Sequence, residues 1–119
     1  MRTFAALLLF TLLFSFSIQY AMAATETVTG EVIDSFCYAT KDSQGKEHSQ
    51  CASSCIKAGV PVAILTVDGK MYFPLREDHK PANNLFEKLG GNRVKTTGVV
   101  YEKNGVKFIV VASVEPIKE

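Results

Sequence analysis

Hydrophobic and polar residues alternate along much of the chain after residue 24, and this pattern predicts β-strands. Alternation with a period of two, with Thr and Val enriched, is typical of a strand that buries one face. An unbroken apolar run of four to eight residues is typical of a strand buried on both faces. Strands are expected at 25–33, 62–67, 71–75, 93–101 and 107–114. Asp68-Gly69 and Asn104-Gly105 are hairpin turn sequences and join the last four strands in pairs.

Two segments between the strands predict short helices. Residues 47–58 contain no Pro or Gly and only one β-branched residue, and Gly59 follows at a position suited to end a helix. Residues 81–89 predict a second helix that Gly90-Gly91 ends. The polar segment 39–46 predicts a loop. The expected order is therefore strand, helix, hairpin, helix, hairpin.

This order is typical of an OB-fold, a partly open barrel of five strands with a helix between the third and fourth. Gly30 and Gly98 lie inside predicted strands, where such a barrel needs sharp bends. The stretches VTGEV at 28–32 and VKTTGVV at 94–100 resemble strand patterns of small exported bacterial OB-fold domains. The resemblance covers most of the chain after residue 24 and implies the fold. It implies no single activity, because members of this group do not share one chemistry.

We therefore predict a mainly β protein with a five-stranded OB-like barrel. A short helix that carries cysteine and histidine would follow the first strand, as an insertion relative to a minimal barrel. A second short helix would lie between the third and fourth strands.

The first 23 residues predict a secretory signal peptide. Arg2 precedes an apolar stretch at 4–18, and Ala21-Met22-Ala23 has the small-x-small pattern that signal peptidase requires. We expect cleavage after Ala23, which leaves a single OB-like domain over residues 24–119, exported to the periplasm or secreted. No membrane span is expected after cleavage.

Composition and charge narrow the classes of partner. Hydrophobic residues make up 47% of the 119 residues and charged residues 21%, which excludes a disordered chain. The 13 basic and 12 acidic residues give a net charge of +1, too little for a nucleic-acid-binding surface. The sequence contains no serine-nucleophile, phosphate-loop or zincin motif. A non-enzymatic module that binds a small ligand or a protein partner is therefore favoured over an enzyme.

Cys37, His48, Cys51 and Cys55 are the residues that point to chemistry. On a single helix, His48, Cys51 and Cys55 would form one stripe at i, i+3 and i+7. The intervening loop is long enough for Cys37, at the end of the first strand, to fold back onto that stripe. Three thiolates and one imidazole suit a soft or borderline metal ion, Zn(II) or Cu(I).

Two other interpretations of these cysteines stay open at this point. A structural disulfide could join Cys37 to Cys51 or Cys55, as is ordinary in an oxidising compartment. A Cys51–Cys55 bridge would strain a helix, because Cβ atoms at i and i+4 lie roughly 5–6 Å apart. Alternatively, Cys51 and Cys55 could be a reactive pair for thiol–disulfide exchange or copper handling, activated by a pKa that His48 lowers. The odd number of cysteines also leaves open a disulfide-linked dimer.

Overall fold

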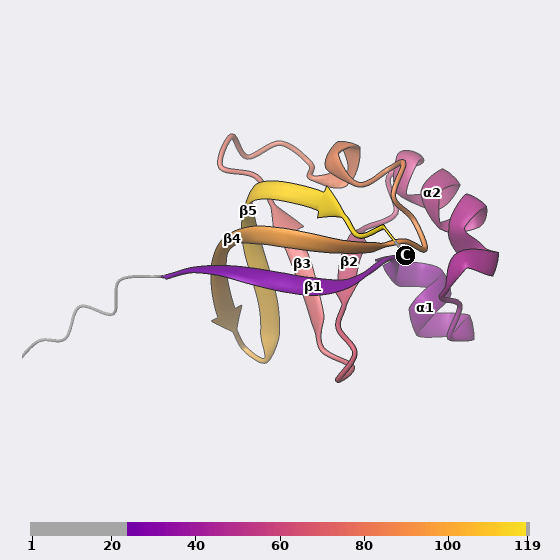
Figure 1. The fold of residues 1–119 in the computed structure, drawn as a ribbon, viewed down its shortest axis with the longest axis horizontal. Helices are drawn as coiled ribbons and strands as arrows, with labels where there is room; N and C mark the ends of the chain where they lie inside the picture. Colours follow the sequence, from indigo (N-terminus) through magenta and orange to yellow (C-terminus); the bar gives the residue numbers. More distant parts are fainter. Residues whose placement is uncertain (1–23, 119) are drawn as a thin grey trace, which may run out of the picture.

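Five β-strands form a closed barrel in the computed structural model, which describes residues 24–118. The strands are β1 (Thr25–Asp34), β2 (Val62–Leu65), β3 (Met71–Leu75), β4 (Arg93–Lys103) and β5 (Val106–Pro116). Their order around the barrel is β1-β2-β3-β5-β4 (Figure 1). β3 and β5 pair in parallel, and the other neighbouring strands pair antiparallel. The mainly β fold is therefore confirmed, and the topology is compatible with an OB-like barrel. The predicted signal peptide lies outside the described residues.

Helical segments between β1 and β2 cover the end of the barrel where β1 finishes (Figure 1). They are α1 (Ser35–Lys41), the 3-10 helix η1 (Lys46–His48) and α2 (Ser49–Lys57). The predicted second helix, before β4, is confirmed in the shorter form of a 3-10 helix, η2 (Asn83–Leu85). No helix within residues 24–118 is long and apolar enough to cross a membrane.

The start of this helical region differs from the prediction. Cys37 was expected at the end of a strand and residues 39–46 in a loop, but Cys37 lies in α1, which continues to Lys41. The reason is a local cap. The Asp34 side chain accepts a hydrogen bond from the Cys37 backbone N–H, which satisfies a donor that the first helical turn would otherwise leave unpaired.

The core of the barrel is formed by side chains from the strands and from two helical segments. Ile56 of α2 and Phe86, the residue after η2, are both fully buried. The buried cluster consists of Val28, Val32, Ile56, Val62, Ile64, Phe86, Val94 and Ile109. Since Ile56 belongs to this cluster, α2 packs as part of the barrel. The cysteines on α2 therefore have a fixed position relative to β1.

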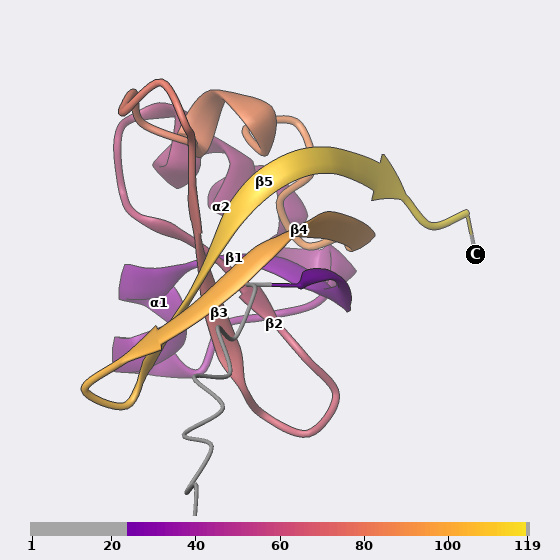
Figure 2. The ribbon, with the colours of Figure 1, turned by 90° about the vertical axis from the view of Figure 1, so that its left-hand side faces the viewer.

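Glycines allow the strands to bend where they pass close to a neighbour. A Cβ atom at Gly98 would collide with the backbone carbonyl of Val110, next to the point where the register of β4 and β5 shifts. A Cβ at Gly30 would collide in the same way with the carbonyl of Leu65. Figure 2 shows how far β5 curves across the barrel. Both glycines therefore lie where a neighbouring backbone leaves no room for a side chain, and the register shift beside Gly98 fits the bend predicted there.

Candidate metal centre

A buried carboxylate at the end of β1 organises the candidate site. The Asp34 side chain is inaccessible to solvent, with 0% exposure. Its Oδ1 accepts the Cys37 backbone N–H at 2.8 Å, and its Oδ2 lies 3.0 Å from Nε2 of His48. One carboxylate therefore links the end of β1, the first turn of α1 and the residue that precedes α2.

Helix α2 supplies the two remaining cysteines from a rigid position. Ile56 points into the core, and Cys51 and Cys55 lie one helical turn apart on the same helix. The Asn83 amide donates hydrogen bonds to the carbonyls of Ile56 and Val60, at 2.8 and 2.7 Å, and so fixes the C-terminal end of α2. Cys51 is exposed and Cys55 is half-buried. The buried side of α2 therefore anchors the helix, and its two thiols lie at the boundary with solvent.

Three sulfur atoms come together where α1 and α2 meet. The Sγ atoms of Cys37, Cys51 and Cys55 all lie within 4.8 Å of one another. Cys37 is buried, and all three cysteines are free thiols. Within the described residues the three cysteines therefore form a group of neighbouring free thiols, with no disulfide between them.

His48 occupies a different place from the one expected. It belongs to η1, which ends just before α2, so it does not continue the helical stripe of Cys51 and Cys55. Its ring belongs instead to a second close group, with Asp34 and Cys37, whose ligand atoms also lie within 4.8 Å of one another. The four predicted site residues and Asp34 therefore form two overlapping groups of three. Cys37 is the residue that both groups share.

The Asp34 carboxylate raises the pKa of the thiols around it. Its hydrogen bond with Cys37, together with burial, raises the pKa of that thiol to about 11. Burial, followed by the negative charge of Asp34, raises the pKa of Cys55. The pKa of Cys55 therefore moves in the opposite direction from the one that an activated thiol would need. A bound cation would offset the negative charge that accumulates when these thiols ionise.

The pKa of Asp34 itself moves in the opposite direction. Burial alone would raise it, but hydrogen bonds from the Cys37 backbone and from His48 outweigh burial and hold the pKa below its usual range. Asp34 therefore stays ionised and faces the thiol of Cys37 and the ring of His48.

Sequence reasoning missed Asp34. An available signal was its position, because an aspartate directly after an apolar strand and three residues before Cys37 fits a helix N-cap. Its contact with His48 had no comparable signal, since the two residues are 14 positions apart and meet only in the folded chain.

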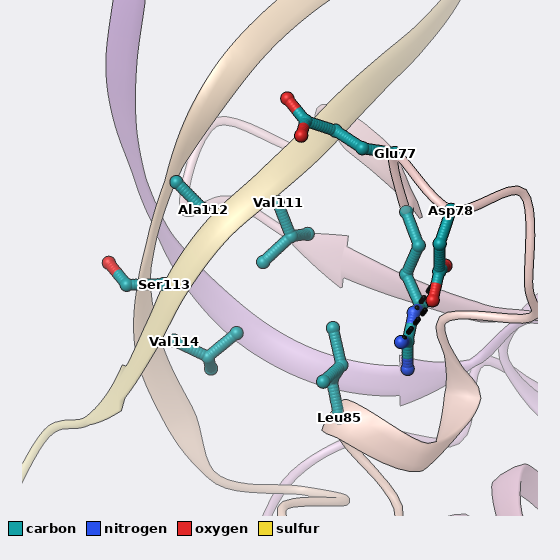
Figure 3. A pocket seen from close by; sticks show the side chains of 8 residues that line it. Glu77, Asp78, Leu85, Val111, Ala112, Ser113 and Val114 are labelled. Carbon is teal, nitrogen blue, oxygen red and sulfur yellow. Dashed lines mark hydrogen bonds and ion pairs between the residues drawn. The ribbon is translucent and has the colours of Figure 1, made fainter.

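A groove beside β5, shown in Figure 3, is another candidate site in the described part of the chain. Its volume is about 480 Å³, and it is lined by residues 76–78, Leu85 and residues 111–114. The guanidinium of Arg76 donates to both carboxylate oxygens of Asp78, at 2.9 and 2.6 Å, and to the amide oxygen of Asn84 at 3.1 Å. The charged groups of Arg76 and Asp78 therefore bind each other, and Arg76 also links this loop to Asn84. The thiol group is the stronger candidate for a functional site.

Comparison of the chain with known protein families, with curated proteins and with solved structures finds no match. The chemistry of the Cys/His/Asp group therefore carries the functional argument. These residues lie close enough together to bind a metal ion.

Proposed function

We propose that the protein is an exported, non-enzymatic binding module that holds one soft metal ion, Zn(II) or Cu(I), on Cys37, Cys51 and Cys55. The observation that carries this proposal is the mutual approach of three sulfur atoms to within 4.8 Å, from two helices fixed to one barrel. Thiolates are the ligands that soft and borderline ions prefer.

The spacing of the sulfur atoms suits such an ion. A Zn–S bond of about 2.3 Å places two sulfurs of a tetrahedral site about 3.8 Å apart, and a planar three-coordinate site about 4.0 Å apart. The observed sulfur–sulfur distances, all within 4.8 Å, exceed these two values by about 1 Å at most.

Asp34 and His48 position the thiol group without belonging to it. The carboxylate fixes the first turn of α1 through the Cys37 backbone and holds the His48 ring at 3.0 Å. Substitution of residues that orient metal ligands commonly lowers metal affinity by about 10–100-fold. In this proposal His48 contributes mainly through Asp34, and the three thiolates bind the ion.

The thiol-exchange alternative has weaker support. An exchange-active cysteine needs a thiolate at neutral pH, and the surroundings of Cys55 favour its protonated form. The exposure of Cys51 is compatible with either function.

The test is a titration of the reduced protein with Zn(II) and, without oxygen, with Cu(I). Thiolate-to-metal absorption would report Cu(I) binding, and a chromophoric competitor would report Zn(II) binding. We expect one ion per chain, with at least a tenfold loss of affinity for Cys37→Ser or Cys55→Ser. Ser54→Ala is the matched control, because Ser54 is an exposed residue of α2 between the two cysteines. Failure of both ions to bind, or equal affinity in Cys55→Ser and Ser54→Ala, would overturn the proposal.

The export part of the proposal rests on the sequence of residues 1–23 and has its own test. The N-terminus of the protein recovered from the exported fraction should begin at Ala24. A protein that stays in the cytoplasm with residues 1–23 attached would contradict it.

A further inference from the structure

The group of close sulfur atoms contains three thiols, and His48, the fourth predicted ligand, contacts Asp34 instead. His48 directs Nε2 to the buried Asp34 carboxylate at 3.0 Å, and the close group of Cys37, Cys51 and Cys55 does not include it. Protein Zn(II) sites are almost always four-coordinate, whereas Cu(I) accepts three thiolates or two. Three thiolates therefore complete a Cu(I) site by themselves, whereas Zn(II) here would need a water or another fourth ligand.

The three thiols also differ in their access to solvent. Cys37 on α1 is buried, Cys55 on α2 is half-buried, and Cys51 on α2 is exposed. An ion held by this group would be covered on the Cys37 side and open on the Cys51 side. A thiolate from another molecule could reach the ion only from that open side.

From these two observations we infer that the site is a Cu(I) transfer site, in which Cys51 is the ligand exchanged with a thiol-bearing partner. The inference rests on the proposed metal-binding function. The partner would be a protein or peptide that presents an exposed pair of cysteines. Copper is the cargo of this exchange and remains in the +1 state throughout.

The exchange step conserves electrons and protons. A partner thiol gives its proton to solvent and forms a new Cu–S bond from the open side. The bond between copper and Cys51 Sγ breaks, and the released Cys51 thiolate takes a proton from solvent. The buried Cys37 and the half-buried Cys55 hold the ion until a second partner thiol gives its proton to solvent and binds the copper. The bonds from copper to Cys37 and Cys55 then break, each released thiolate takes a proton from solvent, and the ion leaves on the two partner thiolates.

The first part of the test is a rate measurement on the reduced protein loaded with one equivalent of Cu(I). It is mixed without oxygen with increasing concentrations of a synthetic peptide that contains two cysteines, and loss of copper is followed by rapid mixing. We expect the transfer rate to rise in proportion to the peptide concentration, because the partner attacks the bound ion. Ser54→Ala should transfer at the wild-type rate. A rate independent of peptide concentration would overturn the inference, since the ion would then leave before the partner arrives.

The second part identifies the ligand that leaves. Alkylating reagent is added to the loaded protein with and without a limiting amount of the peptide, and the labelled cysteines are mapped by mass spectrometry. The peptide should increase labelling of Cys51 at least tenfold more than labelling of Cys37 or Cys55. Preferential labelling of either of the other two would overturn the assignment of Cys51.

A competition with one equivalent each of Cu(I) and Zn(II) separates this inference from the proposed function. Retention of Cu(I) by the three-thiol site supports the inference. Retention of Zn(II) alone would overturn the copper assignment and leave the proposed metal-binding function intact. Failure to bind either ion would overturn both.

Discussion

Replacement of Asp34 tests most directly how the barrel positions the thiol group. Asp34→Ala removes the N-cap of α1 and the partner of His48 in one step. Loss of an N-cap costs about 1 kcal/mol, and loss of a hydrogen bond to a charged group costs about 1.5–3 kcal/mol. We therefore expect the free energy of unfolding to fall by about 2.5–4 kcal/mol. For a domain of this size, that lowers the melting temperature by at least about 10 °C.

Asp34→Asn is the matched variant. Asparagine caps helices about as well as aspartate, so the variant keeps the hydrogen bond to Cys37 and loses mainly the charge that faces His48. Its loss of stability should be clearly smaller than that of Asp34→Ala. Urea unfolding of the reduced, metal-free proteins, followed by circular dichroism, measures both. If the two variants lose the same stability, or if Asp34→Ala loses less than about 0.5 kcal/mol, the role assigned to this carboxylate is wrong.

Three further predictions follow from the same structure. Because the pKa of Asp34 is lowered in the folded state, its stabilising effect is present above the unfolded pKa of about 4 and is lost as the pH falls through the folded value. The stability difference between wild type and Asp34→Asn, from urea unfolding at several pH values, should therefore shrink below about pH 4; a constant difference would contradict this. Cys37, with a pKa of about 11, should be alkylated faster in Asp34→Asn than in the wild type at pH 8, which mass spectrometry can follow; equal rates would show that Asp34 does not set this pKa. Gly98→Ala should cost about 1–3 kcal/mol, because its Cβ would collide with the Val110 carbonyl; an unchanged urea midpoint would contradict the close approach of β4 and β5.

The barrel was predictable because its signals are local. Alternation along the strands, the turn residues and the glycines inside β1 and β4 each depend on a few neighbouring residues. Helix α1 was missed because its seven residues, SFCYATK, include aromatic and β-branched residues that have no strong helix preference. The Asp34 cap favours a helix in this segment, and the fold determines where the Asp34 side chain points.

The candidate site was predictable in its residue types but not in its arrangement. The sequence indicates that Cys37, Cys51 and Cys55 can meet, and the structure places their sulfur atoms within 4.8 Å. The sequence does not indicate that His48 turns toward Asp34, because the two residues are 14 positions apart and meet only in the folded chain. Pairings between side chains distant in the chain are set by packing, which single-sequence patterns do not encode.

The most direct test of the central claim is a native mass spectrum of the protein purified from the exported fraction without chelator or reductant. The proposed function predicts one metal ion per chain, identified by its mass and lost in Cys55→Ser but retained in Ser54→Ala. A mass lower by two hydrogens with no metal would instead show that two of the three thiols pair as a disulfide. That result would contradict the assignment of Cys37, Cys51 and Cys55 as a metal site.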